Sequence, residues 1–145
     1  MSIVYFAEDV PFPKLKRRET SGWIKQVILN EGKSLGDISF IFCSDEYLLE
    51  VNRKYLEHDY YTDIITFDYV EGNVIGGDIF VSVDRVGENA KFFSKTFANE
   101  LNRILIHGVL HLLGYKDKVK ADKKLMTEKE DFYLNMLENS LLGGK

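Results

Sequence analysis

One segment, from Leu101 to Leu113, restricts the fold of this chain more than any other. Its apolar residues recur at helical spacing and cover most of the surface that a helix would present: Leu101, Ile104, Leu105, Val109, Leu112 and Leu113. A helix that is apolar on most sides must be covered by other elements. The segment therefore predicts a central helix, around which the rest of the chain packs.

The remaining elements are expected to be short strands and amphipathic helices. β-branched and aromatic runs predict four strands, at residues 3–7, 38–43, 64–69 and 79–83. Apolar periodicity predicts further helices around residues 23–28, 45–55, 86–93 and 125–137, the second capped by Ser44 and the last ending near Gly143 and Gly144. Glycines are expected in the turns before the second strand and between the third and fourth, namely Gly32, Gly36, Gly72, Gly76 and Gly77. This order predicts a single α+β domain over residues 1–145, with a small mixed sheet of about four strands packed with helices.

Composition argues against several classes of protein. The chain has 145 residues, 45% of them hydrophobic, and it lacks both a basic leader and the roughly 20 apolar residues of a membrane-spanning helix. We therefore expect a cytoplasmic protein without membrane contact. A formal net charge of −4 argues against bulk electrostatic binding of nucleic acid. The single cysteine, Cys43, lies in an apolar strand and is interpreted as core rather than as a catalytic thiol.

Two histidines lie on one face of the central helix. His107 and His111 are four residues apart, so both imidazoles can reach one ion, although this spacing alone also arises by chance. Gly114 can adopt the left-handed conformation that ends a helix, and Asp117 follows three residues later. A carboxylate returned by this turn completes three protein ligands and leaves a fourth position open, as in catalytic zinc sites. The sequence thus predicts a metal site at the end of the central helix, formed by His107, His111 and Asp117.

Such a site is typical of a metal-dependent hydrolase, because a bound metal activates water and polarises a substrate oxygen. The spacing of the two histidines, the glycine and the aspartate also matches the metal turn of metalloproteases. Those enzymes place a glutamate directly after the first histidine as general base, whereas this chain has Gly108 there. A protease-like hydrolase lacks that proton acceptor and is the less favoured alternative.

The segment from His107 to Tyr115 resembles the signature of the YbeY family of bacterial endoribonucleases, also called rRNA maturation factors. That signature runs H-G-x-L-H-L-x-G-Y-D-H, so its last position falls on Asp117 in this chain. Further residues that match the family pattern are Leu49, Asn52, Tyr55, Asp59, Thr62, Asp63, Ile64, Thr66, Phe67, Gly77, Asp78, Ile79, Met126 and Glu130. The likeness covers most of the chain from about Leu48 onwards.

The resemblance implies a zinc-dependent, single-strand-specific endoribonuclease with one zinc ion per chain. It also implies roles in 16S ribosomal RNA 3′-end maturation and in ribosome quality control. The implied partners are single-stranded RNA, ribosomal RNA or the ribosome, and ribosome-associated proteins. A ribosome assembly factor with a structural metal is a second alternative, which the acidic balance of the chain favours.

Three positions depart from the family pattern. Asp117 replaces the third histidine, Lys116 replaces the aspartate before it, and Leu56 replaces the arginine that follows the tyrosine. Aspartate is a competent zinc ligand, so the first change alters the charge of the site without removing a ligand. Neutral Leu56 cannot stabilise negative charge on a phosphate as an arginine does. Lys116 and Lys118 are the candidates for that role from another direction.

Several other residues have both a functional and a structural interpretation. Asp63 and Glu100 are candidates for the proton acceptor, with a cap, a turn or a surface ion pair as the favoured alternative. Four aromatic residues are interpreted as strand core rather than as a surface for stacking RNA bases: Tyr60, Tyr61, Phe67 and Tyr69. The densest basic cluster is interpreted as a solvated face rather than a phosphate-contacting patch, and it comprises Lys14, Lys16, Arg17 and Arg18.

Overall fold

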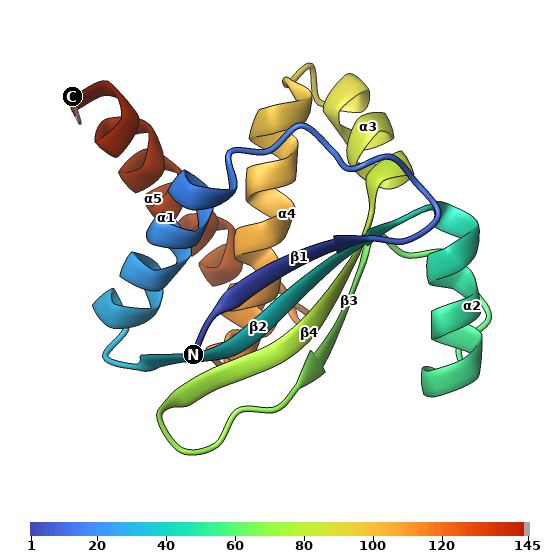
Figure 1. Cartoon of the computed structure of the whole chain (residues 1–145), viewed down its shortest axis with the longest axis horizontal. Coiled ribbons are helices and arrows are strands. Elements are labelled where there is room, and N and C mark those ends of the chain that lie inside the picture. The colour runs from blue at the N-terminus through green and yellow to red at the C-terminus, as the bar shows by residue number, and fades with distance from the viewer. Residues whose placement is uncertain (144–145) are drawn as a thin grey trace.

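The computed structural model describes residues 1–143, and its strands and helices confirm the expected α+β class (Figure 1). In chain order the elements are β1 (Ile3–Ala7), α1 (Arg17–Asn30), β2 (Ser34–Cys43), α2 (Asp45–Leu56), β3 (Ile64–Asp68), β4 (Val74–Ser82), α3 (Val83–Phe92), α4 (Phe97–Leu112) and α5 (Lys120–Gly143). Gly144, near which the last helix was expected to end, lies outside the described residues.

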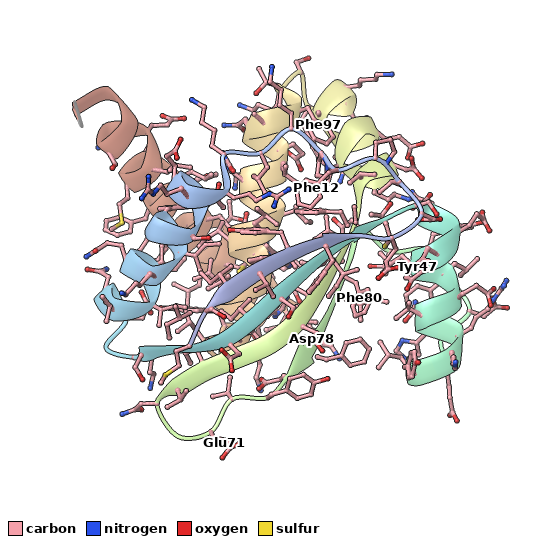
Figure 2. All side chains as sticks on the ribbon, viewed as in Figure 1. Phe12, Tyr47, Glu71, Asp78, Phe80 and Phe97 are labelled. Carbon is pink, nitrogen blue, oxygen red and sulfur yellow. The ribbon has the colours of Figure 1, made fainter. Side chains whose placement is uncertain are left out.

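The four strands form one mixed sheet in the order β1-β2-β4-β3. β1, β2 and β4 run parallel, whereas β3 is antiparallel to β4. The helices α1, α4 and α5 lie over one face of the sheet, and α2 lies against one end of the other face (Figure 1). Side chains follow this division: Phe12 and Phe97 pack into the larger core, whereas Phe80 packs into a small cluster under α2 (Figure 2).

α4 is the central helix that the sequence predicts. Most of its length is buried, including Leu101, Leu105, Ile106 and Val109. It begins at Phe97, one turn earlier than the apolar pattern, because the Thr96 hydroxyl accepts a hydrogen bond from the Asn99 amide at 3.0 Å and caps the helix. α2 is capped in the same way, and the predicted Ser44 cap is confirmed by the hydrogen bond that its hydroxyl accepts from the Tyr47 amide.

Three of the expected turn glycines instead lie inside strands, so their assignment to turns is wrong. Gly36 belongs to β2, and Gly76 and Gly77 belong to β4. A Cβ on Gly77 would lie 2.5 Å from the Phe67 carbonyl oxygen, so glycine is needed there for close approach of the chain rather than for a turn. The true turns use Gly32 and Gly72, both of which have positive φ.

Two further boundaries differ from the sequence pattern. β2 starts at Ser34, four residues before the predicted Ile38, since its first part pairs with β4 across an irregularity in register. Val83 was expected to end a strand but begins α3, because the Ser82 hydroxyl accepts from the Arg85 amide at 3.2 Å. The first boundary depends on pairing with a distant strand and the second on a local cap, and the apolar pattern records neither.

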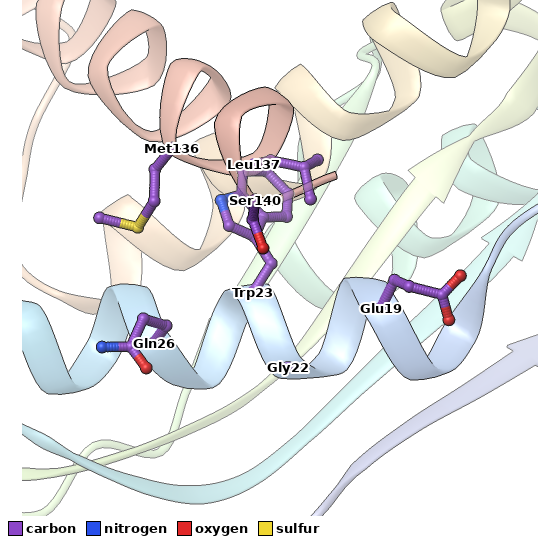
Figure 3. A pocket seen from close by; sticks show the side chains of 7 residues that line it. All are labelled: Glu19, Gly22, Trp23, Gln26, Met136, Leu137 and Ser140. Atoms are coloured by element: carbon purple, nitrogen blue, oxygen red, sulfur yellow. The ribbon is translucent and has the colours of Figure 1, made fainter. Parts of the chain in front are cut away.

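Cys43 is buried, as the sequence predicts. Burial, together with the charges of carboxylates such as Asp9, raises the pKa of its thiol to about 12, which excludes an activated thiolate. A hollow of about 320 Å³ lies between α1 and α5, next to Trp23 and Leu137 (Figure 3). Within residues 1–143, no helix has the length and apolar character needed to cross a membrane.

Candidate metal centre

The chain reverses direction directly after α4, as the sequence predicts. Gly114 has φ +104°, its amide donates to the His111 carbonyl at 3.0 Å, and the Tyr115 amide donates to the Leu110 carbonyl at 3.0 Å. These bonds satisfy the free carbonyls at the helix end and turn the following segment back along the helix. As a result, the carboxylate of Asp117 lies beside the two histidines.

Three side-chain atoms meet at one point. His107 Nε2 lies 3.0 Å from His111 Nε2, and Asp117 Oδ2 lies 3.2 Å from the first nitrogen and 3.3 Å from the second. All three side chains are partly buried, and the group could hold a metal ion. The structure therefore brings together the three residues that the sequence singles out.

The hydrogen bonds of the two Nδ1 atoms determine which nitrogen of each histidine carries the proton. His107 Nδ1 lies 2.6 Å from Glu130 Oε2, and His111 Nδ1 lies 3.0 Å from the Tyr115 carbonyl oxygen. An ionised carboxylate and a carbonyl oxygen only accept, so each Nδ1 carries a proton. In neutral imidazoles each Nε2 then has a lone pair, and these two lone pairs face each other and a carboxylate oxygen. A cation between them would satisfy all three atoms.

The spacing of the three atoms also fits a particular coordination geometry. With zinc–ligand bonds of about 2.0–2.1 Å, neighbouring atoms of a tetrahedral site lie about 3.3 Å apart. The separations between the three candidate ligand atoms are 3.0, 3.2 and 3.3 Å. Three protein ligands at this spacing would leave a fourth position for a further ligand, as in catalytic zinc sites.

Glu130 is a residue of this site whose role sequence reasoning missed. It lies on α5, is only 7% exposed, and binds Arg103 at 2.8 Å as well as His107 at 2.6 Å. Burial lowers the pKa of His107, but the hydrogen bond and charge of Glu130 outweigh it, so the net pKa lies above its usual value. A sequence signal existed, because Glu130 is in helical register with the apolar Met126 and Tyr133.

A second carboxylate anchors the turn itself. Glu31, directly after α1, accepts hydrogen bonds from the hydroxyls of Tyr115 and Tyr133 and from Lys129 Nζ. Burial raises the pKa of Glu31, but these donors outweigh burial and hold the pKa below its usual value. Since the Tyr115 carbonyl orients His111, Glu31 connects α1 to the ligand set.

Of the two candidate proton acceptors, Asp63 lies close enough to His107 and Asp117 to interact with their charges, whereas Glu100 lies farther back along α4. Glu100 is 7% exposed on α4, two turns before His107, and Asp63 is partly buried at the start of β3. Burial raises the pKa of both carboxyls, and the charge of His107 opposes this for Asp63. Neither carboxylate forms an ion pair with another described residue. The structural alternative of a surface ion pair is therefore not supported within residues 1–143.

Two lysines of the turn carry positive charge next to a candidate ligand. Lys116 and Lys118 flank Asp117 and are exposed, and neither is paired with a carboxylate of residues 1–143. Leu56 ends α2 and is 37% exposed, so an apolar side chain occupies the position of the family's arginine. The two lysine side chains are therefore accessible to a phosphate group, whereas Leu56 contributes no positive charge.

The aromatic residues are more exposed than the sequence indicates. Tyr60, Tyr61 and Tyr69 are all exposed and lie in the segments that flank β3, so their interpretation as strand core is wrong, whereas Phe67 is partly buried in β3. The physical reason is that β3 spans only residues 64–68. The basic cluster is exposed at all four positions, as expected of a solvated face: Lys14, Lys16, Arg17 and Arg18.

A four-stranded mixed sheet is packed against a central helix, and this helix and the turn after it bring two imidazoles and a carboxylate to one point. This arrangement defines an α+β protein with a candidate three-ligand metal centre. Comparison with known proteins gives the particular family. Residues 8–138 match the family model described as Endoribonuclease YbeY. The chain therefore belongs to the YbeY family.

Individual relatives agree with this assignment. The chain is 55% identical over 137 residues to Endoribonuclease YbeY of Parabacteroides distasonis, with 94% of this chain and 96% of that protein covered. It is 51% identical over 136 residues to the protein of the same name from Bacteroides thetaiotaomicron, with 94% and 99% covered. The solution structure of TM1509 from Thermotoga maritima matches the fold with a TM-score of 0.68 at 27% identity, covering 98% of this chain and 93% of that one.

Proposed function

We propose that this protein is a zinc-dependent, single-strand-specific endoribonuclease that acts in 16S ribosomal RNA 3′-end maturation and in ribosome quality control. The observation that carries the proposal is the convergence of His107, His111 and Asp117 in a chain whose relatives are named endoribonucleases. We further propose that residues 1–145 act as one domain in the cytoplasm. Its partners would be ribosomal RNA or the ribosome, and ribosome-associated proteins.

The ligand set supports one zinc ion per chain as the cofactor. Two imidazoles and one carboxylate at tetrahedral spacing are donors that zinc accepts, and a fourth position stays free. A bound zinc ion supplies Lewis-acid activation of water and of a phosphoryl oxygen. His107 and His111 would hold the ion through Nε2 as neutral rings, because their Nδ1 protons are engaged by Glu130 and by the Tyr115 carbonyl.

We assign proton transfer to Asp63, which is partly buried near the ligands, or to Glu100, which is buried two turns before His107. Burial raises the pKa of Asp63 and of Glu100, which makes each a stronger base than an exposed carboxylate. Asp63→Asn and Glu100→Gln are expected to reduce kcat by about 10²-fold or more at whichever position accepts the proton. Cleavage can proceed by attack of water or by attack of the RNA's own 2′-hydroxyl. A substrate whose scissile nucleotide lacks that hydroxyl separates these two routes, because only the second route requires it.

Lys116 and Lys118 are proposed to contact the phosphate in place of the missing arginine. They flank a metal ligand and have no carboxylate partner among the described residues. Replacing each by alanine is expected to lower RNA cleavage, whereas Lys91→Ala, at an exposed lysine of α3, is expected to leave it unchanged. Undiminished cleavage in both Lys116→Ala and Lys118→Ala would remove this role.

The test of the proposed function is cleavage by one preparation of single-stranded RNA, duplex RNA and casein, each with and without a chelator. We expect loss of single-stranded RNA alone, abolished by chelation and restored by zinc. Casein loss would instead favour the protease. The buried position of Gly108 argues against that outcome, because a side chain there would meet Ile64 and Ile79 within 3.0 Å. Absence of any cleavage would favour the assembly factor, which the neutral Leu56 also supports.

A further inference from the structure

The strand β1 leaves one edge of the sheet open. It pairs only with β2, at the end of the strand order (Figure 1). The Ser2 carbonyl accepts from the Ile38 amide, and the Glu8 amide donates to the Phe42 carbonyl, each at 2.9–3.0 Å. Main-chain groups alternate in direction along a strand, so the even-numbered residues face β2. The amides and carbonyls that face away from the sheet are those of Ile3, Tyr5 and Ala7.

A groove with a basic wall runs along this open edge. It has a volume of about 450 Å³ and lies between β1 and the first half of α1. Arg17, Arg18 and Ser21 line the groove from α1. Lys25 lies two helical turns after Arg18, on the same side of the helix. None of these cations forms an ion pair with a carboxylate of residues 1–143.

The other face of the same edge is apolar. Val4 is 39% exposed and Phe6 is 50% exposed, and both belong to the part of β1 that borders the groove. They point to the face of the sheet opposite α1, because side chains alternate along the strand and Tyr5 packs into the core beneath that helix. A strand added beside β1 would therefore meet positive charge on one face and apolar side chains on the other.

We propose that this groove binds an extended segment of a partner protein, which pairs with β1 as an added strand and in which acidic and apolar residues alternate. The free main-chain groups of β1 supply the pairing, Arg17 and Arg18 select the acidic side chains, and Val4 and Phe6 select the apolar ones. RNA could use the two arginines but would leave the strand edge unpaired. A second copy joined through β1 would bring two basic walls to the same side, where like charges repel.

The alternation itself can be tested with synthetic peptides. The probe is a fluorescein-labelled nine-residue peptide in which glutamate and valine alternate, and its control has the same composition in two blocks. We expect the alternating peptide to bind at least about tenfold more tightly in fluorescence anisotropy, since only that peptide sorts acidic and apolar side chains onto opposite faces. N-methylation of the amides along one edge of the peptide should abolish binding, and along the other edge should not. Equal binding of both sequences, or no binding of either, overturns the proposal.

Variants of the protein test the basic wall. Arg17→Glu with Arg18→Glu is expected to weaken peptide binding by at least about tenfold, because it reverses the charge of the wall. The matched control, Lys123→Glu with Lys124→Glu on α5, is expected to leave binding unchanged. Circular dichroism melting of both variants establishes that each is folded, and Phe6→Glu gives a second test through the apolar face. Binding that survives the arginine reversal overturns the proposal, as does a poly(U) oligonucleotide that competes with the peptide, or dimerisation that buries β1.

Discussion

Oε2 of Glu130 lies 2.6 Å from Nδ1 of His107, so a buried carboxylate on α5 orients an imidazole on α4. Such a carboxylate holds the ring in one tautomer and increases its basicity toward a metal. We expect Glu130→Gln to weaken zinc binding by about 10–100-fold, measured by competition with a chromogenic chelator. Asp131→Asn is the matched control, because Asp131 also binds Arg103 but does not contact the histidine. Equal zinc affinity in both variants would contradict this role of Glu130.

The same contact predicts a pH dependence for the metal-free protein. The pKa of His107 is raised above its usual 6.5, because Glu130 outweighs the effect of burial. A raised pKa in the folded state stabilises the protein below pH 6.5, and this contribution is lost as pH rises through the folded value. The free energy of unfolding of chelator-treated protein should therefore fall as pH rises from 6.5. In urea titrations Glu130→Gln should show a flatter dependence, and an identical slope would argue against the coupling.

Removal of the Glu31 charge should loosen the metal turn. Glu31 accepts hydrogen bonds from Tyr115, Tyr133 and Lys129, and its pKa is lowered because these donors outweigh burial. A lowered pKa stabilises the folded state above pH 4.5, and this contribution is lost as pH falls through the folded value. Glu31→Gln is expected to cost about 1–3 kcal/mol at pH 7, with the difference from wild type shrinking below pH 4.5. A cost that does not change with pH would show that the carboxylate charge is not the cause.

Close packing of α4 on the sheet is tested by two glycine substitutions. A Cβ on Gly77 would lie 2.5 Å from the Phe67 carbonyl and 2.9 Å from Leu112, so Gly77→Ala is expected to destabilise the protein by about 1–3 kcal/mol. Gly87 on α3 has open space around it, and Gly87→Ala is expected to stabilise the protein by up to about 1 kcal/mol through helix propensity. Thermal melting measures both. A Gly77→Ala variant as stable as wild type would show that the strand can shift.

Local patterns predicted the parts of this fold that depend on local chemistry. The apolar stripe predicts α4, Ser44 predicts the start of α2, and Gly114 predicts the turn that returns Asp117 to the histidines. Each of these features is decided within one or two helical turns of the chain. That is why the ligand set could be derived from spacing.

Features that depend on distant contacts could not be predicted in this way. Glu130 is 23 residues from His107, and Glu31 is 84 residues from Tyr115, so packing of separate helices creates both contacts. Gly77 was assigned to a turn because sequence does not reveal the carbonyl that approaches it. The exposure of Tyr60 and Tyr61 follows from the short length of β3, which its pairing with β4 decides.

The most direct test of the metal centre is the zinc content of the purified chain and of His111→Ala, with their melting temperatures before and after chelation. We expect one zinc ion per chain in the wild type and a melting temperature that falls on chelation, because a ligand that binds only the folded state stabilises it. His111→Ala should bind little zinc and should not respond to the chelator. Full zinc occupancy in His111→Ala would contradict the three-ligand site.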